Sequence, residues 1–143
     1  MLSNFYVYNS GGLNGSIFTS GTILKSNAWN HVAVTRASGV FRLFLNGALT
    51  ASDASATFNF TNTTLFRTGA CQPAYTDGST NCYMHSLRIT KGTALYTANT
   101  TPPTSPLTAV ANTALLTCQT NRFNDNSPNN LTISKAGDVS VQK

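Results

Sequence analysis

Polar and apolar residues alternate with a period of two along two neighbouring stretches, residues 29–36 and residues 40–45. This period, together with β-branched and aromatic side chains, is typical of strands with one buried face. The face that collects the apolar residues carries Val32 and Val34 in the first stretch, and Phe41, Leu43 and Leu45 in the second. The pattern predicts two half-buried β-strands.

Two short turns connect these strands to each other and to a third. Residues 37–39 contain Gly39 and predict a short turn, so the two strands form a hairpin. Asn46 and Gly47 favour a type I′ turn because both tolerate positive φ. A third strand should then return through residues 48–51.

The rest of the chain also predicts strands, over residues 2–9, 15–25, 57–60, 65–68, 82–90, 114–118, 131–134 and 139–141. Residues 91–98 predict a single helical turn. Residues 101–106 hold three prolines and predict an extended linker, because proline cannot pair inside a sheet. The sequence has no long amphipathic helical pattern and no internal repeat, so we expect an all-β protein.

Three segments of the sequence carry a resemblance. The stretch WNHVAVTRASGVFRLFLNG, residues 29–47, resembles the centre of laminin-G-like, concanavalin A-like jelly-roll domains. Residues 83–97, with Thr-Pro-Pro at 101–103, are similar to the closing segment of such domains in tailed-phage virion proteins, particularly those of marine and cyanobacterial phages. Residues 115–127 resemble the segment that follows one such domain and leads into the next. The resemblance implies an antiparallel β-sandwich of the concanavalin A-like jelly-roll type.

The expected organisation is a jelly-roll body at residues 1–100, a Pro/Thr-rich linker at 101–112 and a C-terminal β segment at 113–143. The resembling domains have several strands before the one that matches residues 5–8, which leaves apolar faces and strand edges open. Either the C-terminal strands fold back to fill this gap, or a neighbouring subunit donates the strands. We expect the chain to assemble with copies of itself or with other virion proteins.

The composition fits this expectation. Of the 143 residues 41% are hydrophobic but only 9% are charged, so the polar surface must consist mainly of Thr, Ser and Asn. The net charge of +5 comes from scattered basic residues without a run or stripe, which disfavours a nucleic-acid site. The N-terminus lacks the pattern of a signal peptide, and no apolar run could insert into a membrane. We expect a virion protein made in the host cytoplasm.

The carboxylates argue against an enzyme. Glutamate is absent, so the Glu-x-Asp-x-Glu strand motif of the jelly-roll glucanases cannot exist here. Glycosidases use two carboxylates that flank the scissile bond, whereas each aspartate here falls in a predicted turn, where its backbone role is sufficient explanation. His31 and His85 are expected to be structural. The four aspartates are Asp53, Asp77, Asp125 and Asp138.

Two binding sites are candidates. Related lectin-like domains bind calcium through loop aspartates, and Asp53 and Asp77 are the two that lie in the body of the domain. For a sugar, an exposed aromatic ring stacks on the pyranose face while polar groups fix its orientation. In the polar loop at residues 69–81, Tyr75 is the candidate ring, and the candidate polar partners are Gln72, Asp77 and Asn81.

The cysteines suggest a loop closure. Cys71 and Cys82 flank that same loop, and a disulfide between them is compatible with its length, although a reducing cytosol disfavours the bond before release. Cys118 is expected to be an inert packed thiol. No close pairing of Cys and His predicts a zinc site.

These observations predict a non-enzymatic phage virion structural or adhesion module without a cofactor, with a capsid-decorating, head-fibre or tail-associated position. The alternative is a lectin-like carbohydrate-binding module that attaches the particle to a host surface glycan. The two differ in whether a loop site binds a glycan.

Overall fold

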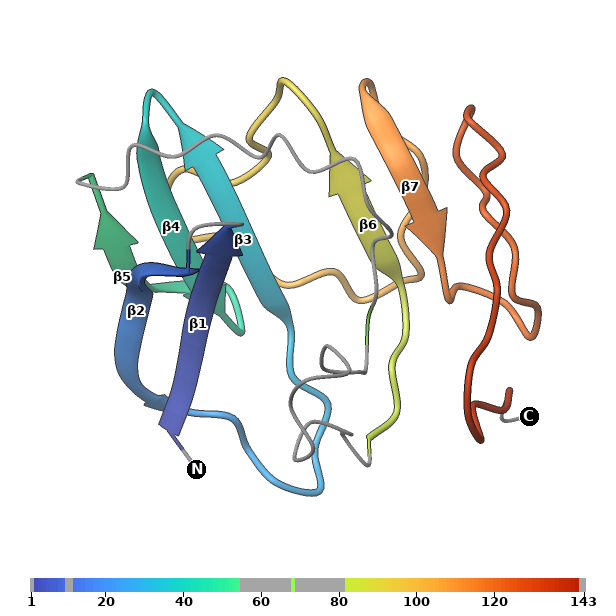
Figure 1. The fold of residues 1–143 in the computed structure, drawn as a ribbon, viewed down its shortest axis with the longest axis horizontal. Helices are drawn as coiled ribbons and strands as arrows, with labels where there is room; N and C mark the ends of the chain where they lie inside the picture. Colours follow the sequence, from blue (N-terminus) through green and yellow to red (C-terminus); the bar gives the residue numbers. More distant parts are fainter. Residues whose placement is uncertain (1, 10–11, 55–67, 69–81, 142–143) are drawn as a thin grey trace.

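The computed structural model describes residues 2–9, 12–54, 68 and 82–141, with side chains from residue 24 onward, and this part of the chain contains strands and loops but no helix. Every strand pair is antiparallel, as an antiparallel β-sandwich requires (Figure 1). The strands are β1 (Leu2–Asn9), β2 (Gly12–Ile23), β3 (Val32–Ala37), β4 (Val40–Leu45), β5 (Ala48–Asp53), β6 (Leu87–Thr90) and β7 (Thr113–Thr117). The predicted strand at 57–60 and nearly all of that at 65–68 lie outside the described residues.

The central sheet has the order β3-β4-β5 and forms from two tight hairpins. Asn46 and Gly47 both have positive φ, 51° and 84°, as a type I′ turn requires, so this prediction is confirmed. The first turn also has two residues of positive φ, Ser38 and Gly39, because Ala37 pairs with Val40 and belongs to the strand. The turn is therefore one residue shorter than predicted.

The strand predicted from residue 29 begins only at Val32, because the preceding residues fold into a turn. The Asn30 amide donates to the carbonyls of Lys25 (2.8 Å) and Ala28 (3.0 Å), and its Oδ1 accepts a hydrogen bond from the Lys25 N–H. These bonds hold residues 25–30 in a compact loop, as asparagine commonly does in turns.

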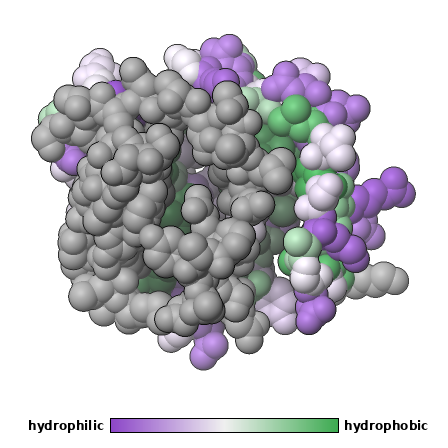
Figure 2. Space-filling model, viewed as in Figure 1, coloured by the Kyte–Doolittle hydropathy of each residue, from purple (hydrophilic) through white to green (hydrophobic). Residues whose placement is uncertain are grey.

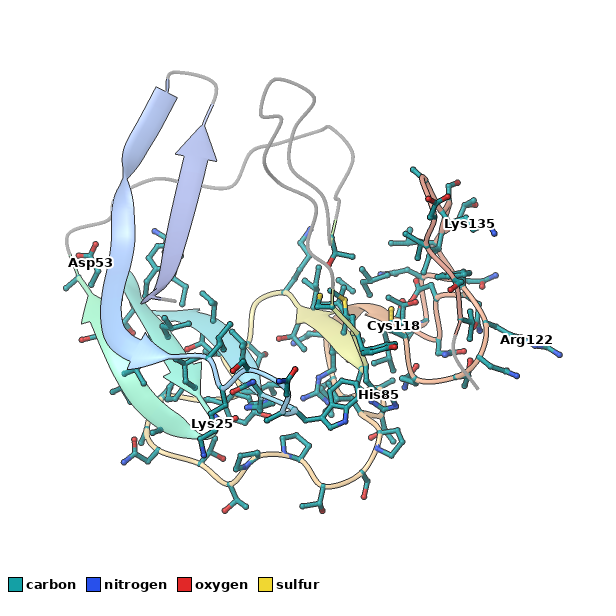
Figure 3. All side chains as sticks on the ribbon, turned by 90° about the horizontal axis from the view of Figure 1, so that it is seen from below. Lys25, Asp53, His85, Cys118, Arg122 and Lys135 are labelled. Atoms are coloured by element: carbon teal, nitrogen blue, oxygen red, sulfur yellow. The ribbon has the colours of Figure 1, made fainter. Side chains whose placement is uncertain are left out.

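The core centres on β4. Phe44 is fully buried and its ring packs edge-on against Tyr96, which belongs to the segment that crosses one face of the sheet (Figure 3). The residues on the opposite face of β4, Phe41, Leu43 and Leu45, are buried at 1–4% exposure. The β1–β2 pair covers that face, with β2 in contact with β4 and β5. Successive side chains of a strand point to opposite faces of the sheet, so those of β4 alternate between two covered faces.

The segment at 91–98 has no helical turn, contrary to the prediction. Tyr96 in this segment and Asn99 just after it bind the central sheet instead. The Tyr96 carbonyl accepts a hydrogen bond from Thr35 Oγ1 at 2.8 Å, and Asn99 Oδ1 accepts one from the Leu49 N–H at 2.8 Å. Tertiary hydrogen bonds therefore replace the local i→i−4 bonds that a helix needs.

The strand predicted at residues 82–90 is confined to β6, because Ser86 has a φ of 56° and interrupts the extended backbone.

The C-terminal segment contributes β7, which pairs with β6, so part of it folds back onto the body. The further strands predicted at 131–134 and 139–141 are wrong, since neither stretch is a strand. Leu131 and Val139 are half exposed, and among the described strands none pairs with either stretch. Figure 2 shows hydrophobic residues over the region of β6 and β7, with hydrophilic residues beyond them.

Candidate binding surface

An exposed aromatic cluster lies where the loop before β3 approaches the loop before β6. Trp29 is 72% exposed and Tyr83 is 74% exposed, which is unusual for such large side chains. The Trp29 ring meets the His85 ring edge-on, with 6.3 Å between the ring centroids. We call the Trp29 and His85 pair the aromatic patch; Tyr83, two residues before His85, is exposed as well, and His85 is labelled in Figure 3.

Backbone contacts position both sides of this patch. On one side, Asn46 Oδ1 accepts a hydrogen bond from the His31 N–H at 2.9 Å, which fixes the chain two residues after Trp29. On the other side, the Ser86 hydroxyl lies 2.8 Å from His85 Nδ1, and the Ser86 N–H donates to the Cys118 carbonyl at 2.8 Å. The patch therefore rests on fixed backbone although its side chains face solvent.

His31 lies behind the patch and differs from it chemically. Its ring packs edge-on against Tyr96 at 5.9 Å, and within the described part of the chain its buried Nδ1 has no hydrogen-bond partner. Burial, and secondarily the positive charge of Arg88, lower the pKa of His31 below its ordinary value of 6.5. The imidazole is therefore neutral at pH 7, and no carboxylate among its described neighbours orients it as a general base.

Asp125 is a buried carboxylate, only 4% exposed, and all its contacts are structural. Its Oδ1 accepts hydrogen bonds from the N–H groups of Leu116 (2.9 Å) and Ser127 (2.8 Å). Its Oδ2 accepts hydrogen bonds from the Leu131 N–H (2.9 Å) and the Ser127 hydroxyl (2.7 Å). Burial alone would raise its pKa, but the hydrogen bonds from Leu131, Leu116 and Ser127 lower the pKa to about 2. Asp125 therefore stays ionised and has no free lone pair aimed at a substrate.

The comparison with protein families decides the relationship. A family model described as the concanavalin A-like lectin/glucanases superfamily matches residues 3–99. The chain belongs to this superfamily. The comparison with curated proteins found no match, and neither did the comparison with solved structures. The membership agrees with the resemblance of residues 29–47 and with the antiparallel sandwich of the structure.

All four residues of the predicted lectin-type site lie outside the described residues, namely Gln72, Tyr75, Asp77 and Asn81, and so does Cys71 of the predicted disulfide. Asp53 is the last residue of β5 and half-buried, at the far end of the sheet from His85 (Figure 3). Among the residues described, no three His, Cys, Asp or Glu side chains gather as a metal site. Cys82 is exposed and Cys118 is half-buried. The calcium pair and the disulfide stay predictions.

Sequence reasoning placed Trp29 at the start of a strand and did not recognise it as a surface residue. The available signal was the Lys-Ser-Asn-Ala run before it, whose Ser and Asn are turn formers. In this member of the superfamily, that turn carries the tryptophan out of the sheet.

The described residues contain no helix long and apolar enough to cross a membrane.

Proposed function

We propose that this chain is a non-enzymatic virion module that works by adhesion, holding other virion proteins or copies of itself in an assembled particle. The aromatic patch is the observation that carries the proposal. Trp29 and Tyr83 expose large rings, at 72% and 74%, that a partner could bury. Aromatic residues dominate the energetics of protein interfaces because they bury a large area with little loss of side-chain entropy.

The charge distribution supports a role without chemistry. Asp125 is occupied by four hydrogen bonds, and Asp138 lies in an exposed bend. Arg122 and Lys135 extend from the C-terminal segment, far from Lys25 (Figure 3), so the described basic residues form no stripe that could follow a nucleic acid. The superfamily includes lectins and glucanases by its description, and the lack of glutamate favours the binding role over the hydrolytic one.

Particles provide the direct test. Purified particles of the phage that encodes this chain are imaged by cryo-electron microscopy with and without an antibody fragment raised against it. We expect the fragment at regular positions on the particle surface. A chain that is abundant in the lysate but missing from the particles contradicts the virion role, as does hydrolysis of a glycan by the purified chain.

A lectin-like function is the second candidate, and the exposure of Trp29 favours it specifically. Sugars stack on exposed aromatic faces, and the neighbouring His85 ring supplies polar atoms. Because Trp29 is the single tryptophan, its fluorescence reports directly on a ligand at this patch.

The test is a glycan array followed by fluorescence titration of each hit. We expect a hit to shift the Trp29 emission and to be lost in Trp29→Ala. Titrations with calcium and with EDTA show whether calcium is needed. An array without hits contradicts the lectin function, and hits that Trp29→Ala retains would place the sugar elsewhere, for instance at Tyr75.

A further inference from the structure

The residues that follow the proline-containing segment bind the body at one place. We call residues 107–141 the arm; it contains β7, which pairs with β6. In the described part of the chain, five further hydrogen bonds of 2.8–3.3 Å join the arm to the body. Their partners on the body are Ser86, Arg88, Lys91 and Thr93. The hydrogen bonds between arm and body therefore converge on one short stretch, residues 86–93.

The arm has an organisation of its own. The four hydrogen bonds to Asp125 come from Leu116, Ser127 and Leu131, which all belong to the arm. The Asn126 N–H donates to the Leu116 carbonyl at 2.7 Å. These bonds do not involve the body, so they do not depend on where β7 is docked. The arm can therefore move as a unit.

Residues 101–106, which we call the hinge, connect the arm to the body. Hydrogen bonds flank the hinge at Thr100 and Leu107, but in the described part of the chain none involves the hinge itself. Three of its residues are prolines and two more directly precede a proline, which restricts their backbone angles and favours an extended chain. Thr104 is the exception, and the chain bends at residues 104 and 105.

The family match agrees with this division. It ends at residue 99, just before the hinge, whereas β7 lies in the arm. Yet β7 is the strand that pairs with β6 in the described chain (Figure 1), and its Leu116 is 1% exposed. The body therefore needs an arm along residues 86–93, and an arm from a second copy makes the same bonds there.

We propose that two copies of this chain exchange their arms, so that β7 of each copy pairs with β6 of the other. The bonds between arm and body are the same in the closed chain and in the exchanged dimer, and only the hinge changes its path. A straightened hinge of six residues spans about 20 Å, which gives each arm the reach to a second body. This inference rests on the assembly role proposed above and names the contact between copies.

The test uses two single-cysteine chains in a background of Cys71→Ser, Cys82→Ser and Cys118→Ser. One chain carries Ile89→Cys and the other Leu115→Cys, because Ile89 and Leu115 are directly opposite in the β6–β7 ladder, within the range of a disulfide. The two chains are unfolded together, refolded and oxidised, since exchange requires the arm to leave β6. We expect about half of the dimers to be disulfide-linked on a non-reducing gel, as random pairing of two variants gives.

Two controls identify the link. A chain with both Ile89→Cys and Leu115→Cys links two chains in an exchanged dimer, whereas in a closed chain its bridge stays within one chain. Each single-cysteine chain refolded alone should give no linked pair, because its cysteine lies opposite a residue without a thiol. Linked pairs in these samples would measure chance collision.

A second measurement needs no engineered cysteine. Size-exclusion chromatography with light scattering, under reducing conditions, gives the dimer fraction with and without Gly-Ser-Gly-Ser-Gly-Ser inserted after Thr104. A longer hinge lets the arm fold back on its own body, so we expect the dimer fraction to fall at least about fivefold. The same insertion after Lys135, in the exposed end of the arm, is the matched control and should leave the dimer fraction unchanged.

Three outcomes overturn the inference. The chain refolds only as a monomer at every concentration, or dimers form while the double-cysteine chain links only within itself. If the serine background does not refold, the insertions decide, and equal dimer fractions after Thr104 and after Lys135 overturn the exchange. None of these outcomes concerns whether particles contain the chain, so the exchange and the virion role fail separately.

Discussion

At the scale of single residues, Asp125 shows how one side chain organises a segment without regular structure. It gathers backbone N–H groups from β7, from its own turn and from Leu131, at positions up to nine residues away from it along the chain. A carboxylate that accepts several backbone hydrogen bonds is held in its charged form. The sequence identified Asp125 as a turn residue, but the distant donor Leu116 was visible only in the fold.

Replacing Asp125 with asparagine should lower the free energy of unfolding by about 2–4 kcal/mol, because an amide nitrogen would face donors that now meet an oxygen. Urea denaturation of Asp125→Asn measures this loss. Asp138→Asn is the control, since Asp138 is exposed and its substitution should change little. Equal effects of the two substitutions would contradict the structural role of Asp125.

The low pKa of Asp125 also predicts acid sensitivity. The folded pKa of about 2 lies below the ordinary value of 3.8, so the folded state binds fewer protons than the unfolded state between these values. The stabilisation is complete above about pH 4 and is lost as the pH falls toward 2. Thermal melts across this pH range should show a fall in melting temperature that is smaller in Asp125→Asn than in the wild type.

His31 predicts a second pH dependence, in a higher range. Its folded pKa is lowered, so the unfolded state takes up a proton first as the pH falls. Stability is complete above about pH 6.5 and is lost as the pH falls below that value. Chemical denaturation at several pH values between 7.5 and about 5 measures how the free energy of unfolding changes with pH. This free energy should fall with pH in the wild type and in His85→Gln, but the His31 contribution to the slope should be absent in His31→Gln. A slope that survives in His31→Gln would assign it to another group.

At the scale of elements, the turn between β4 and β5 needs a glycine for two reasons, a positive φ and the close approach of another segment. Gly47 has a φ of +84°, and a Cβ at this position would lie 2.0 Å from the Thr100 carbonyl oxygen. Gly39, in the other hairpin turn, has a similar φ of +80° but open space around it. The pair separates the cost of backbone strain from the cost of displacing the segment that crosses the sheet.

Gly47→Ala should therefore destabilise the chain more than Gly39→Ala, by about 3 kcal/mol against about 1 kcal/mol. Chemical denaturation of both variants gives the comparison. If both cost the same, the contact between Gly47 and residues 100–102 contributes nothing to stability.

At the scale of the whole molecule, β7 joins the C-terminal segment to the body. Leu116 is 1% exposed, and the pairing of β6 with β7 is the only sheet partnership of β6 in the described chain. Removing residues 113–143 would expose the apolar face of β6 and its backbone groups. Removing residues 134–143 takes away an end whose described residues, 134–141, are exposed.

Truncation after residue 112 should lower the melting temperature by more than about 10 °C or abolish cooperative unfolding, because a buried leucine and a strand ladder are lost. Truncation after residue 133 should leave the melt nearly unchanged. A stable, cooperative fragment 1–112 would show that the C-terminal segment is independent of the body.

Local sequence was sufficient to predict the elements that depend on near neighbours. The alternation at residues 32–37 and 40–45 and the Asn46-Gly47 turn gave the hairpins, because period and φ preference act over a few residues. The fold was needed to show where Trp29 lies, why residues 91–98 form no helix, and which donors bind Asp125. These depend on groups distant in the chain, whose hydrogen bonds outweigh local preference. The exposure of Val32 and Val34 is of the same kind: their pattern predicts a buried face, but how far each is covered depends on what packs against it in the fold.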